Sequence, residues 1–365
     1  MKRLAFALLA LFIASAVIAD DEPKASAEKP APPLGARADK LIKEALPVCS
    51  EPVTESRVAM QHQLPTNMVG AVVRTASEHH LCDGQWVAII TNDGDFFMGT
   101  PWFLDDTEGA TVEQRIKTFT LQNLKEVFEP VVDRTKTRNG LFRATLYQSM
   151  EGGKLPLEGE VDPYGTVFFF GHFVPMATDY RVSRLKAFDH FLAQSPVTGA
   201  AKPEVTVIEF SDFECPSCQR AAGFMKPILS AHADKVRYIR YDTPLLNIHP
   251  WALPAAVAGR AVWHQKPELF WKYKETIYEN QDKLSAFTID DFARGFAQDH
   301  DLDMKKYDAE VKSPELAADI VNGVGTAFSN DVRATPTYII NGAMVEAGHE
   351  GKGLVDYVNS LLKAR

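Results

Sequence analysis

The sequence is short of several features that define specialised classes of protein. Its 365 residues include four cysteines, too few for a small scaffold held together by disulfides. Lys and Arg number 39 against 48 Asp and Glu, and this net charge of -9 argues against general binding to nucleic acid or to anionic membranes. Glycine and proline, 22 of each, exclude a collagen-like or low-complexity chain. The composition is that of a globular protein long enough for two or three domains.

The N-terminus carries an apolar run that is too short to cross a bilayer as a helix. The run covers residues 4–18, about 15 residues where about 20 are needed, and two basic residues precede it. Val17 and Ala19 occupy the small-residue positions that a signal peptidase reads. We therefore predict a cleaved signal peptide over residues 1–19 and a periplasmic or secreted protein, with a retained anchor as the alternative. Residues 20–37, rich in Pro, Ala, Lys and Glu, are expected to form a disordered linker.

Two segments in the first half of the chain resemble each other when they are aligned on a glycine. In each, a turn at 92–94 or 163–165 precedes a β-prone run rich in phenylalanine, which we interpret as a buried strand. An amphipathic helix containing the pattern Arg-aliphatic-Lys-X-Phe is expected to follow, at 115–119 and at 184–188. The similarity predicts a duplicated module, and chance similarity of short hairpins is the alternative.

This pattern resembles the small N-terminal domain of the bacterial disulfide isomerases DsbC and DsbG, in which a strand, a turn and a second strand precede a linker helix. We expect two small α+β modules, over residues 38–122 and 123–196. In that family the domain makes the dimer and helps to form a cleft for unfolded proteins. Because this chain has two copies, which can pair with each other, the resemblance does not imply a homodimer.

The second half of the chain contains a cysteine pair at the junction of a strand and a helix. Residues 205–211 are β-branched and aromatic, as expected of a buried strand. They lead to Cys215, Pro216, Ser217 and Cys218, and then to a stretch with helical spacing. Cys215 is expected at the start of the helix, where free N–H groups and the helix dipole favour the thiolate that attacks a disulfide. Cys218, one turn later on the same face, is placed to resolve the mixed disulfide.

Other uses of this cysteine pair fit the sequence less well. A c-type haem needs a histidine directly after the second cysteine, and Gln219 stands there. Structural zinc needs two further ligands, and Cys49 and Cys82 form no second C-x-x-C motif. A static disulfide between Cys215 and Cys218 is a third alternative. We favour the redox interpretation and expect neither a metal nor a cofactor.

Residues 203–363, with the motif EFSDFECPSCQ, resemble the DsbA-like branch of the thioredoxin-fold oxidoreductases. The resemblance implies an α/β thioredoxin fold with a helical insertion, which we expect over residues 197–365. Glu209, six residues before Cys215, matches the buried acid that such proteins place beneath the active site. The role implied for Glu209 is to accept a proton from Cys218, with a pKa raised by burial. An ordinary solvated glutamate is the alternative.

A second signature of the same family lies far downstream, at Thr335 and Pro336. It implies a cis peptide bond opposite the cysteines, which leaves the backbone of Thr335 free to pair with an extended client segment. An ordinary edge-strand proline is the alternative. Asn341 and Gly342 predict a tight turn between two strands. Residues 251–330, with aromatic and aliphatic residues at helical intervals, resemble the helical insertion of DsbA-like proteins.

The two remaining cysteines, Cys49 and Cys82, lie 33 positions apart. In an oxidising compartment they most simply form a structural disulfide, and an electron relay to Cys215 is the alternative. Together these features predict an exported thiol-disulfide oxidoreductase, an oxidase or an isomerase. It would act on exported proteins that carry thiols or disulfides and would exchange electrons with a membrane or soluble redox partner, without binding nucleic acid. The rival interpretation is an exported chaperone or binding protein without redox turnover.

Overall fold

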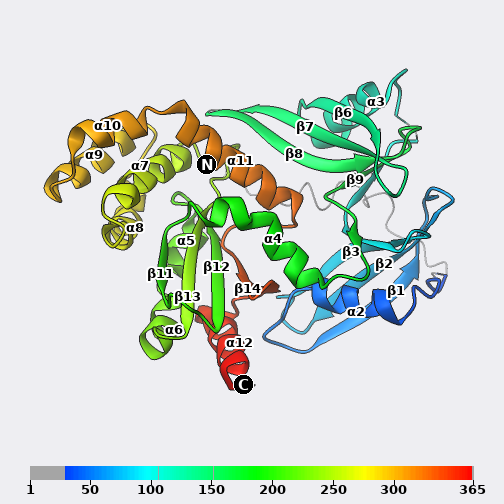
Figure 1. The fold of residues 1–365 in the computed structure, drawn as a ribbon, viewed down its shortest axis with the longest axis horizontal. Coiled ribbons are helices and arrows are strands. Elements are labelled where there is room, and N and C mark those ends of the chain that lie inside the picture. The colour runs from blue at the N-terminus through cyan, green and yellow to red at the C-terminus, as the bar shows by residue number, and fades with distance from the viewer. Residues whose placement is uncertain (1–28, 106, 151, 364–365) are drawn as a thin grey trace, which may run out of the picture.

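Three five-stranded sheets organise residues 29–105, 107–150 and 152–363, the part of the chain that this computed structural model describes (Figure 1). The predicted signal peptide and residues 20–28 of the predicted linker lie outside the described residues. In the described remainder of that linker, Pro30 forms a β-bridge with Val58.

The α-helices are α2 (Ala36–Ala45), α3 (Val112–Phe119), α4 (Tyr180–Leu192), α5 (Pro216–Ala221), α6 (Met225–His232), α7 (Ala252–Gln265), α8 (Leu269–Glu279), α9 (Ile289–Asp299), α10 (Met304–Val311), α11 (Pro314–Ser329) and α12 (Lys352–Lys363). A short π-helix, η1 (Thr120–Leu124), and two 3-10 helices, η2 (Gln281–Lys283) and η3 (His349–Gly351), accompany them. The strands are β1 (Val53–Ala59), β2 (Met68–Ser77), β3 (Gly84–Thr91), β4 (Asp95–Gly99), β5 (Pro101–Phe103), β6 (Glu129–Lys136), β7 (Phe142–Met150), β8 (Gly153–Val161), β9 (Val167–Phe170), β10 (Val174–Pro175), β11 (Val197–Gly199), β12 (Val205–Ser211), β13 (Val236–Asp242), β14 (Thr337–Ile340) and β15 (Ala343–Val345).

The first half of the chain forms two sheets that exchange a strand. One has the order β1-β2-β3-β4-β10 and the other the order β5-β9-β8-β7-β6. Strand β5 follows β4 in the sequence but pairs with β9, whereas β10 follows β9 but pairs with β4. The two repeats therefore correspond element by element, because β1–β5 with α3 has the same order and pairing as β6–β10 with α4. Each sheet takes four strands from one copy and its fifth from the other.

The repeated turns and phenylalanine runs of the sequence shape both copies in the same way. Gly94 and Gly165 have φ of 80° and 67°, values that glycine adopts without steric cost, and they reverse the chain before β4 and β9. The phenylalanines of both strands are buried. Phe97 and Phe169 pack edge to face across the two sheets, with ring centroids 5.5 Å apart. The aromatic runs thus form the core that joins the copies.

The third sheet, of order β11-β13-β12-β14-β15, forms the second half of the chain. The central strand β12 pairs in parallel with β13 and antiparallel with β14. Helices α6 and α12 pack on the face that carries Val205 and Val207, and α4 and α11 pack on the face that carries Ile208 and Phe210. Helices α7–α11 connect β13 to β14 and form the helical end of the molecule (Figure 1).

The helical stretch after Cys218 is divided, where the sequence pattern predicts one helix. Helix α5 ends at Ala221 and α6 begins at Met225. Pro227 has no N–H to donate and its ring excludes the carbonyl of the preceding turn, so a continuous helix through this point is unfavourable. The break leaves α5 as a short helix that carries both cysteines of the pair.

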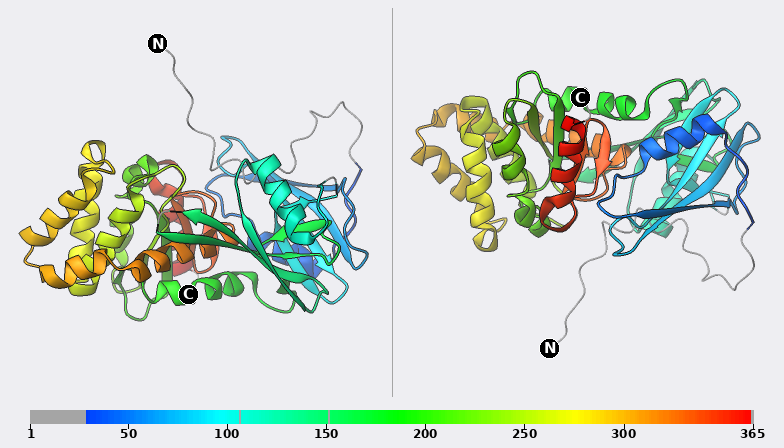
Figure 2. Two further views of the ribbon diagram at one scale, coloured as in Figure 1. Left: turned by 90° about the horizontal axis from the view of Figure 1, so that it is seen from above. Right: turned by 90° about the horizontal axis from the view of Figure 1, so that it is seen from below.

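Strand β8 connects the first half of the chain to the second by packing closely on α11. A Cβ atom added to Gly325 would lie 2.0 Å from the carbonyl oxygen of Pro156, so only glycine permits this approach. The backbone N–H of Glu158 donates to the hydroxyl of Ser329 at the end of the helix (2.9 Å). Figure 2 shows the long β7–β8 hairpin lying along α11. Over the described residues, no helix is long and apolar enough to cross a membrane.

Candidate active site around Cys215 and Cys218

The two cysteines of the C-x-x-C motif lie at the start of α5, directly after β12. Cys215 is the N-cap residue, with an extended backbone, and Pro216 opens the helix. Both thiols are free in the structure, and the side chain of Cys218 is fully buried while that of Cys215 is 6 % exposed. The predicted order, an outer cysteine at the helix start and an inner one a turn later, is therefore the one observed.

The environment moves the pKa values of the two thiols in opposite directions. The pKa of Cys215 falls to about 6, chiefly through the hydrogen bond with Cys218 and further through hydrogen bonding with Thr335, although burial opposes the shift. Burial, followed by the hydrogen bond and the charge of Cys215, raises the pKa of Cys218 well above its usual value. Near neutral pH, these shifts favour the thiolate at Cys215 and the protonated thiol at Cys218.

The proline signature lies directly opposite this thiol. The peptide bond between Thr335 and Pro336 is cis, and the carbonyl oxygen of Thr335 lies 3.4 Å from the Sγ of Cys215. Thr335 is buried, and strand β14 starts at Thr337. Two segments 120 residues apart in the sequence therefore meet at the reactive sulfur.

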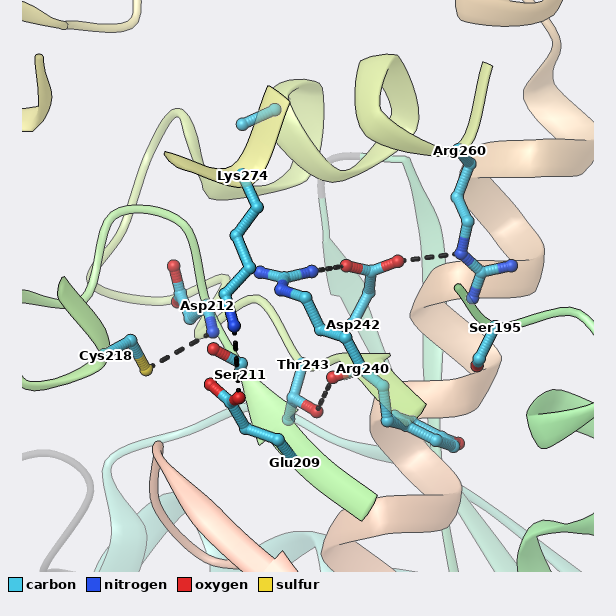
Figure 3. A network of polar contacts seen from close by, with 12 residues as sticks. Ser195, Glu209, Ser211, Asp212, Cys218, Arg240, Asp242, Thr243, Arg260 and Lys274 are labelled. Atoms are coloured by element: carbon cyan, nitrogen blue, oxygen red, sulfur yellow. Dashed lines mark hydrogen bonds and ion pairs between the residues drawn. The ribbon is translucent and has the colours of Figure 1, made fainter. Parts of the chain in front are cut away.

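Glu209 lies in the middle of β12 and is fully buried, as predicted, but its pKa is lowered rather than raised. Burial alone would raise the pKa of Glu209, but the charge of Lys274 and a hydrogen bond from the Tyr238 hydroxyl outweigh it. The ammonium of Lys274, from α8 in the helical insertion, lies 3.2 Å from the carboxylate (Figure 3). The prediction of a raised pKa was wrong because the sequence does not show that this distant lysine is buried beside the acid.

Burial acts on the pKa of Lys274 in the opposite direction to its effect on the pKa of Glu209. The side chain is 6 % exposed, and burial lowers its pKa against the opposing charge of Glu209. Its ammonium also donates to the Tyr238 hydroxyl (2.6 Å). The pair is thus an ion pair with a hydrogen-bonded tyrosine, enclosed between the central sheet and the helical insertion.

A second buried charge cluster lies beside the first and was not predicted from the sequence. Arg240 and Asp242, two residues apart on β13, are ion-paired, and Arg260 of α7 reaches the other oxygen of Asp242 (2.7 Å; Figure 3). The guanidinium of Arg240 lies over the ring of Phe213, 3.7 Å from its centroid. The sequence contained one signal of this cluster. Arg240 and Asp242 stand two positions apart in the largely apolar run that forms β13, so both side chains point to the same face.

Two loops are fixed to the segment between β12 and Cys215. On one side, His249 contacts Asp212 (2.6 Å) and the backbone N–H of Trp251 donates to Glu214 (2.7 Å). On the other, the amide of Gln281 donates to the carbonyl oxygens of Phe213 (2.8 Å) and Cys215 (3.2 Å). Sequence reasoning did not identify Gln281, because no motif marks it. These contacts position the backbone that leads to the nucleophile.

The two remaining cysteines, Cys49 and Cys82, form a disulfide with each other and not with the C-x-x-C pair. The disulfide between Cys49 and Cys82 joins the segment after α2 to the β2–β3 connection. Next to it, Val48 forms a β-bridge with Val345 in β15, the edge strand of the third sheet. The disulfide therefore lies at the contact between the first half of the chain and the second.

Comparison with known families defines the class of the second half of the chain. Residues 192–360 match the family model described as Thioredoxin. With the sheet order, this match confirms the predicted thioredoxin fold for this region, and α7–α11 are inserted between β13 and β14. The resemblance of the N-terminal modules to the isomerases stays a prediction.

The curated relatives are longer proteins of which this chain spans about a fifth. The Na(+)/H(+) antiporter NhaA 3 of Salinispora tropica is 33 % identical over 146 residues, 40 % of this chain and 21 % of the relative. The Na(+)/H(+) antiporter NhaA of Herminiimonas arsenicoxydans is 24 % identical over 156 residues, 43 % of this chain and 24 % of the relative. Antiport describes those proteins and is not carried over to this chain.

Solved structures align with about half of the chain. BdbD from Bacillus subtilis, in its oxidised form, is 20 % identical and covers 47 % of this chain and 95 % of its own, with a TM-score of 0.41. The thiol-disulfide exchange protein alpha-DsbA2 from Wolbachia pipientis is 18 % identical, with coverages of 50 % and 97 % and a TM-score of 0.41. The catalytic domain of Proteus mirabilis ScsC is 19 % identical, with coverages of 50 % and 99 % and a TM-score of 0.42.

Proposed function

We propose that this chain is a thiol-disulfide oxidoreductase that exchanges disulfides with exported client proteins through Cys215 and Cys218. The observation that carries the proposal is the geometry at the start of α5: Cys215 is the N-cap residue opposite the carbonyl oxygen of Thr335, and Cys218 is buried one turn later. This arrangement shifts the pKa values of the two thiols in opposite directions. A lowered pKa supplies a thiolate at neutral pH, and a raised pKa keeps the second thiol protonated until the mixed disulfide has formed. Two cysteines with a purely structural role would not need one thiol to be ionised and the other protonated.

In one direction, the exchange reduces a client disulfide. The thiolate of Cys215 attacks one sulfur of the client disulfide, that bond breaks, and the other client sulfur leaves as a thiolate. Cys218 then loses its proton and attacks the Sγ of Cys215, which releases the second client sulfur and forms the Cys215–Cys218 disulfide. Two electrons pass from the chain to the client. Run backwards, the same steps oxidise a client dithiol.

The proton of Cys218 needs an acceptor during resolution, and we keep Glu209 in that role as a proposal. One carboxylate oxygen of Glu209 is occupied by Tyr238 and Lys274. The other, Oε1, is buried without a hydrogen-bond partner among the described residues. Because the pKa of Glu209 is lowered, the carboxylate is ionised and able to accept, although it is a weaker base than predicted.

The cis-proline supports binding of an extended client segment next to the nucleophile. The backbone of Thr335 faces Cys215 ahead of strand β14. A client strand added at this point would pair through its own backbone, which tolerates many sequences. We infer that recognition at Thr335 and Pro336 is independent of the client's side chains.

The type of disulfide exchange is proposed from the pKa of the Cys215 thiol. At about 6, the pKa of Cys215 lies between those of thioredoxin, about 7, and DsbA, about 3.5. A thiol of intermediate pKa is both a fair attacking and a fair leaving group, which suits disulfide isomerisation. Equilibration with glutathione is expected to give a reduction potential between about -270 and -120 mV.

The test is refolding of scrambled ribonuclease and reduction of insulin by the full mature chain. The unmodified chain is expected to catalyse both reactions, and Cys215→Ser to catalyse neither. The matched control is Cys49→Ser with Cys82→Ser, which removes the other disulfide and should leave the activity intact. Equal effects of the unmodified chain and Cys215→Ser on the yield would favour a chaperone without redox turnover. Fractionation of the producing cell tests the proposed export.

A further inference from the structure

The 330–336 loop, which connects α11 to β14, is anchored in both halves of the chain. Val332 is fully buried in the core between the third sheet and α4. The guanidinium of Arg333, the next residue, lies over the ring of Phe170, with its Cζ 4.3 Å from the ring centroid. Phe170 belongs to β9, so this second contact connects the loop to the first half of the chain.

The position of Arg333 is fixed by further contacts. Its Nη2 donates to the carboxylate of Asp331 (3.1 Å), and its side chain is 18 % exposed. Its Nη1 is buried without a hydrogen-bond partner among the described residues, so the ring face of Phe170 is the group that stabilises this part of the cation. Asp331 has a φ of 64°, a left-handed value that few non-glycine residues adopt. The turn at Asp331 and the ion pair together direct Arg333 towards the first half of the chain.

Phe170 is a rigid platform for this cation. Its ring is 2 % exposed and stacks on that of Trp102, with centroids 5.6 Å apart and planes inclined by 10°. Trp102 lies on the exchanged strand β5, so both copies of the repeat build the platform. At Gly171, the next residue, an added Cβ would lie 3.0 Å from the carbonyl oxygen of Ser329, the last residue of α11. Strand β9 therefore ends close to the start of the 330–336 loop.

The same loop reaches the reactive sulfur two residues after Arg333. The carbonyl oxygen of Thr335 lies 3.4 Å from the Sγ of Cys215, and hydrogen bonding with Thr335 helps to lower the pKa of that thiol. Ala334 alone separates Thr335 from Arg333. Because one residue offers two soft backbone dihedrals and no more, a displacement of Arg333 is passed on to Thr335. The distance between Thr335 and the thiol therefore depends on where Arg333 is held.

We propose that Arg333 is a positioning residue, through which the first half of the chain holds the 330–336 loop at its distance from Cys215. The inference rests on the proposed function and gives the two sheets of the first half a role in it. Arg333 acts through Thr335 and takes no part in the sulfur chemistry. Without the contact between Arg333 and Phe170, the loop moves relative to α5, and the hydrogen bonding that stabilises the thiolate weakens.

The test changes a residue of the first half and measures a thiol of the second, as the pH midpoint of iodoacetamide alkylation of Cys215 in the reduced full chain. Phe170→Leu removes the ring beneath Arg333, and Phe168→Leu is the matched control. Phe168 is fully buried on the same strand and stacks on the same Trp102 (centroids 5.0 Å apart), so both variants lose one ring from one core. For Phe170→Leu we expect the midpoint to rise from about 6 by about 0.5 to 1 pH unit, part of the effect of one hydrogen bond to a thiolate. Phe168→Leu should leave it unchanged.

Variants of Arg333 test the same contact from its other side. Arg333→Gln removes the cation and should raise the midpoint as far as Phe170→Leu does. The double variant should raise it no further, because both changes remove one and the same interaction. Arg333→Lys keeps a cation within reach of the ring and should retain most of the low midpoint.

The outcomes separate the contact between Arg333 and Phe170 from a general loss of packing and from the proposed function. Equal midpoints for Phe170→Leu and Phe168→Leu, shifted or not, overturn the positioning role. A double variant whose shift is the sum of the two single shifts also overturns it. Alkylation needs no turnover, so the midpoints decide the role of Arg333 whether or not insulin is reduced. Failure of the unmodified chain to reduce insulin instead overturns the proposed function.

Discussion

At the scale of single residues, the proposed chemistry depends on two positions at the start of one short helix. Cys215 caps α5 and Cys218 lies within it, so one thiol meets the free end of the helix and the other meets the core. The hydrogen bond between the thiols is the largest cause of the lowered pKa of Cys215, whereas burial, followed by that hydrogen bond, raises the pKa of Cys218. The difference between the two thiols thus comes from their positions, because the residue type is the same.

The first prediction concerns the thiolate of Cys215. With a pKa of about 6, the rate at which iodoacetamide alkylates the reduced protein should rise with pH around a midpoint near 6, with Cys218 unmodified at neutral pH. The ordinary pKa of a cysteine thiol is about 9.0, so the pKa of Cys215 in the folded protein is depressed. The stabilisation of the reduced form is therefore complete above pH 9 and lost as pH falls through about 6. Thermal unfolding of the reduced protein over this range measures that loss.

The matched variant is Cys218→Ala, which removes the largest cause of the shift. Its alkylation midpoint should move upward from about 6, towards the value of an ordinary thiol. An unchanged midpoint would mean that the hydrogen bond with Cys218 does not set the pKa of Cys215.

The second prediction concerns the buried pair of Glu209 and Lys274. Lys274→Met leaves a carboxylate buried without its cation, and such a change costs about 3 to 5 kcal/mol. Urea unfolding should show this loss, and the loss should shrink at acid pH, where Glu209 in the variant gains a proton. The double variant Lys274→Met with Glu209→Gln should recover part of the stability. If the single variant is as stable as the unmodified chain at pH 7, the ion pair does not hold the insertion on the sheet.

Single residues also show how far the sequence could predict the site. The cysteines and the Thr335–Pro336 pair were predictable because each lies in a short motif. Lys274 was not, because it comes from a helix 65 positions away from Glu209 and only the fold brings the two together. That missing partner is the reason the predicted direction of the Glu209 pKa was wrong.

At the scale of elements, the contact between β8 and α11 connects the two halves of the chain. The third prediction is that Gly325→Ala costs about 1 to 3 kcal/mol, because its new Cβ would lie 2.0 Å from the backbone oxygen of Pro156 and force the strand and helix apart. Gly295→Ala is the control, since that glycine is in α9 with open space around it. It should stabilise by about 0.5 to 1 kcal/mol through helix propensity. Equal effects in chemical denaturation would show that the close approach is unimportant.

The strands of the third sheet were the most predictable elements. The β-branched run at 205–211 is β12 to the residue, because a strand buried on both faces leaves a continuous apolar signature. The exchange of β5 and β10 between sheets was not predictable, since it depends on which edges meet and not on local pattern. The repeat in the sequence indicated two copies but not how they pair.

At the scale of the whole molecule, the disulfide lies where the halves of the chain meet. The fourth prediction is that Cys49→Ala with Cys82→Ala lowers the free energy of unfolding by about 3 to 4 kcal/mol, from release of the loop that the bond closes. The alkylation midpoint of Cys215 should not move. Loss of insulin reduction without loss of thermal stability would instead indicate an electron relay between the two cysteine pairs.

The fifth prediction follows from the exchanged strands and the aromatic core between the first two sheets. Each copy already receives its fifth strand from the other, and Phe97 and Phe169 fill the core between them, so the surface that one copy would offer to a second chain is occupied within the molecule. Analytical ultracentrifugation of the mature protein should give the mass of one chain over a wide range of concentration. Phe97→Ala, which leaves a cavity in this core, should lower the free energy of unfolding by about 3 to 5 kcal/mol without creating a dimer. A two-chain species that dissociates on dilution would show that the exchange also occurs between molecules.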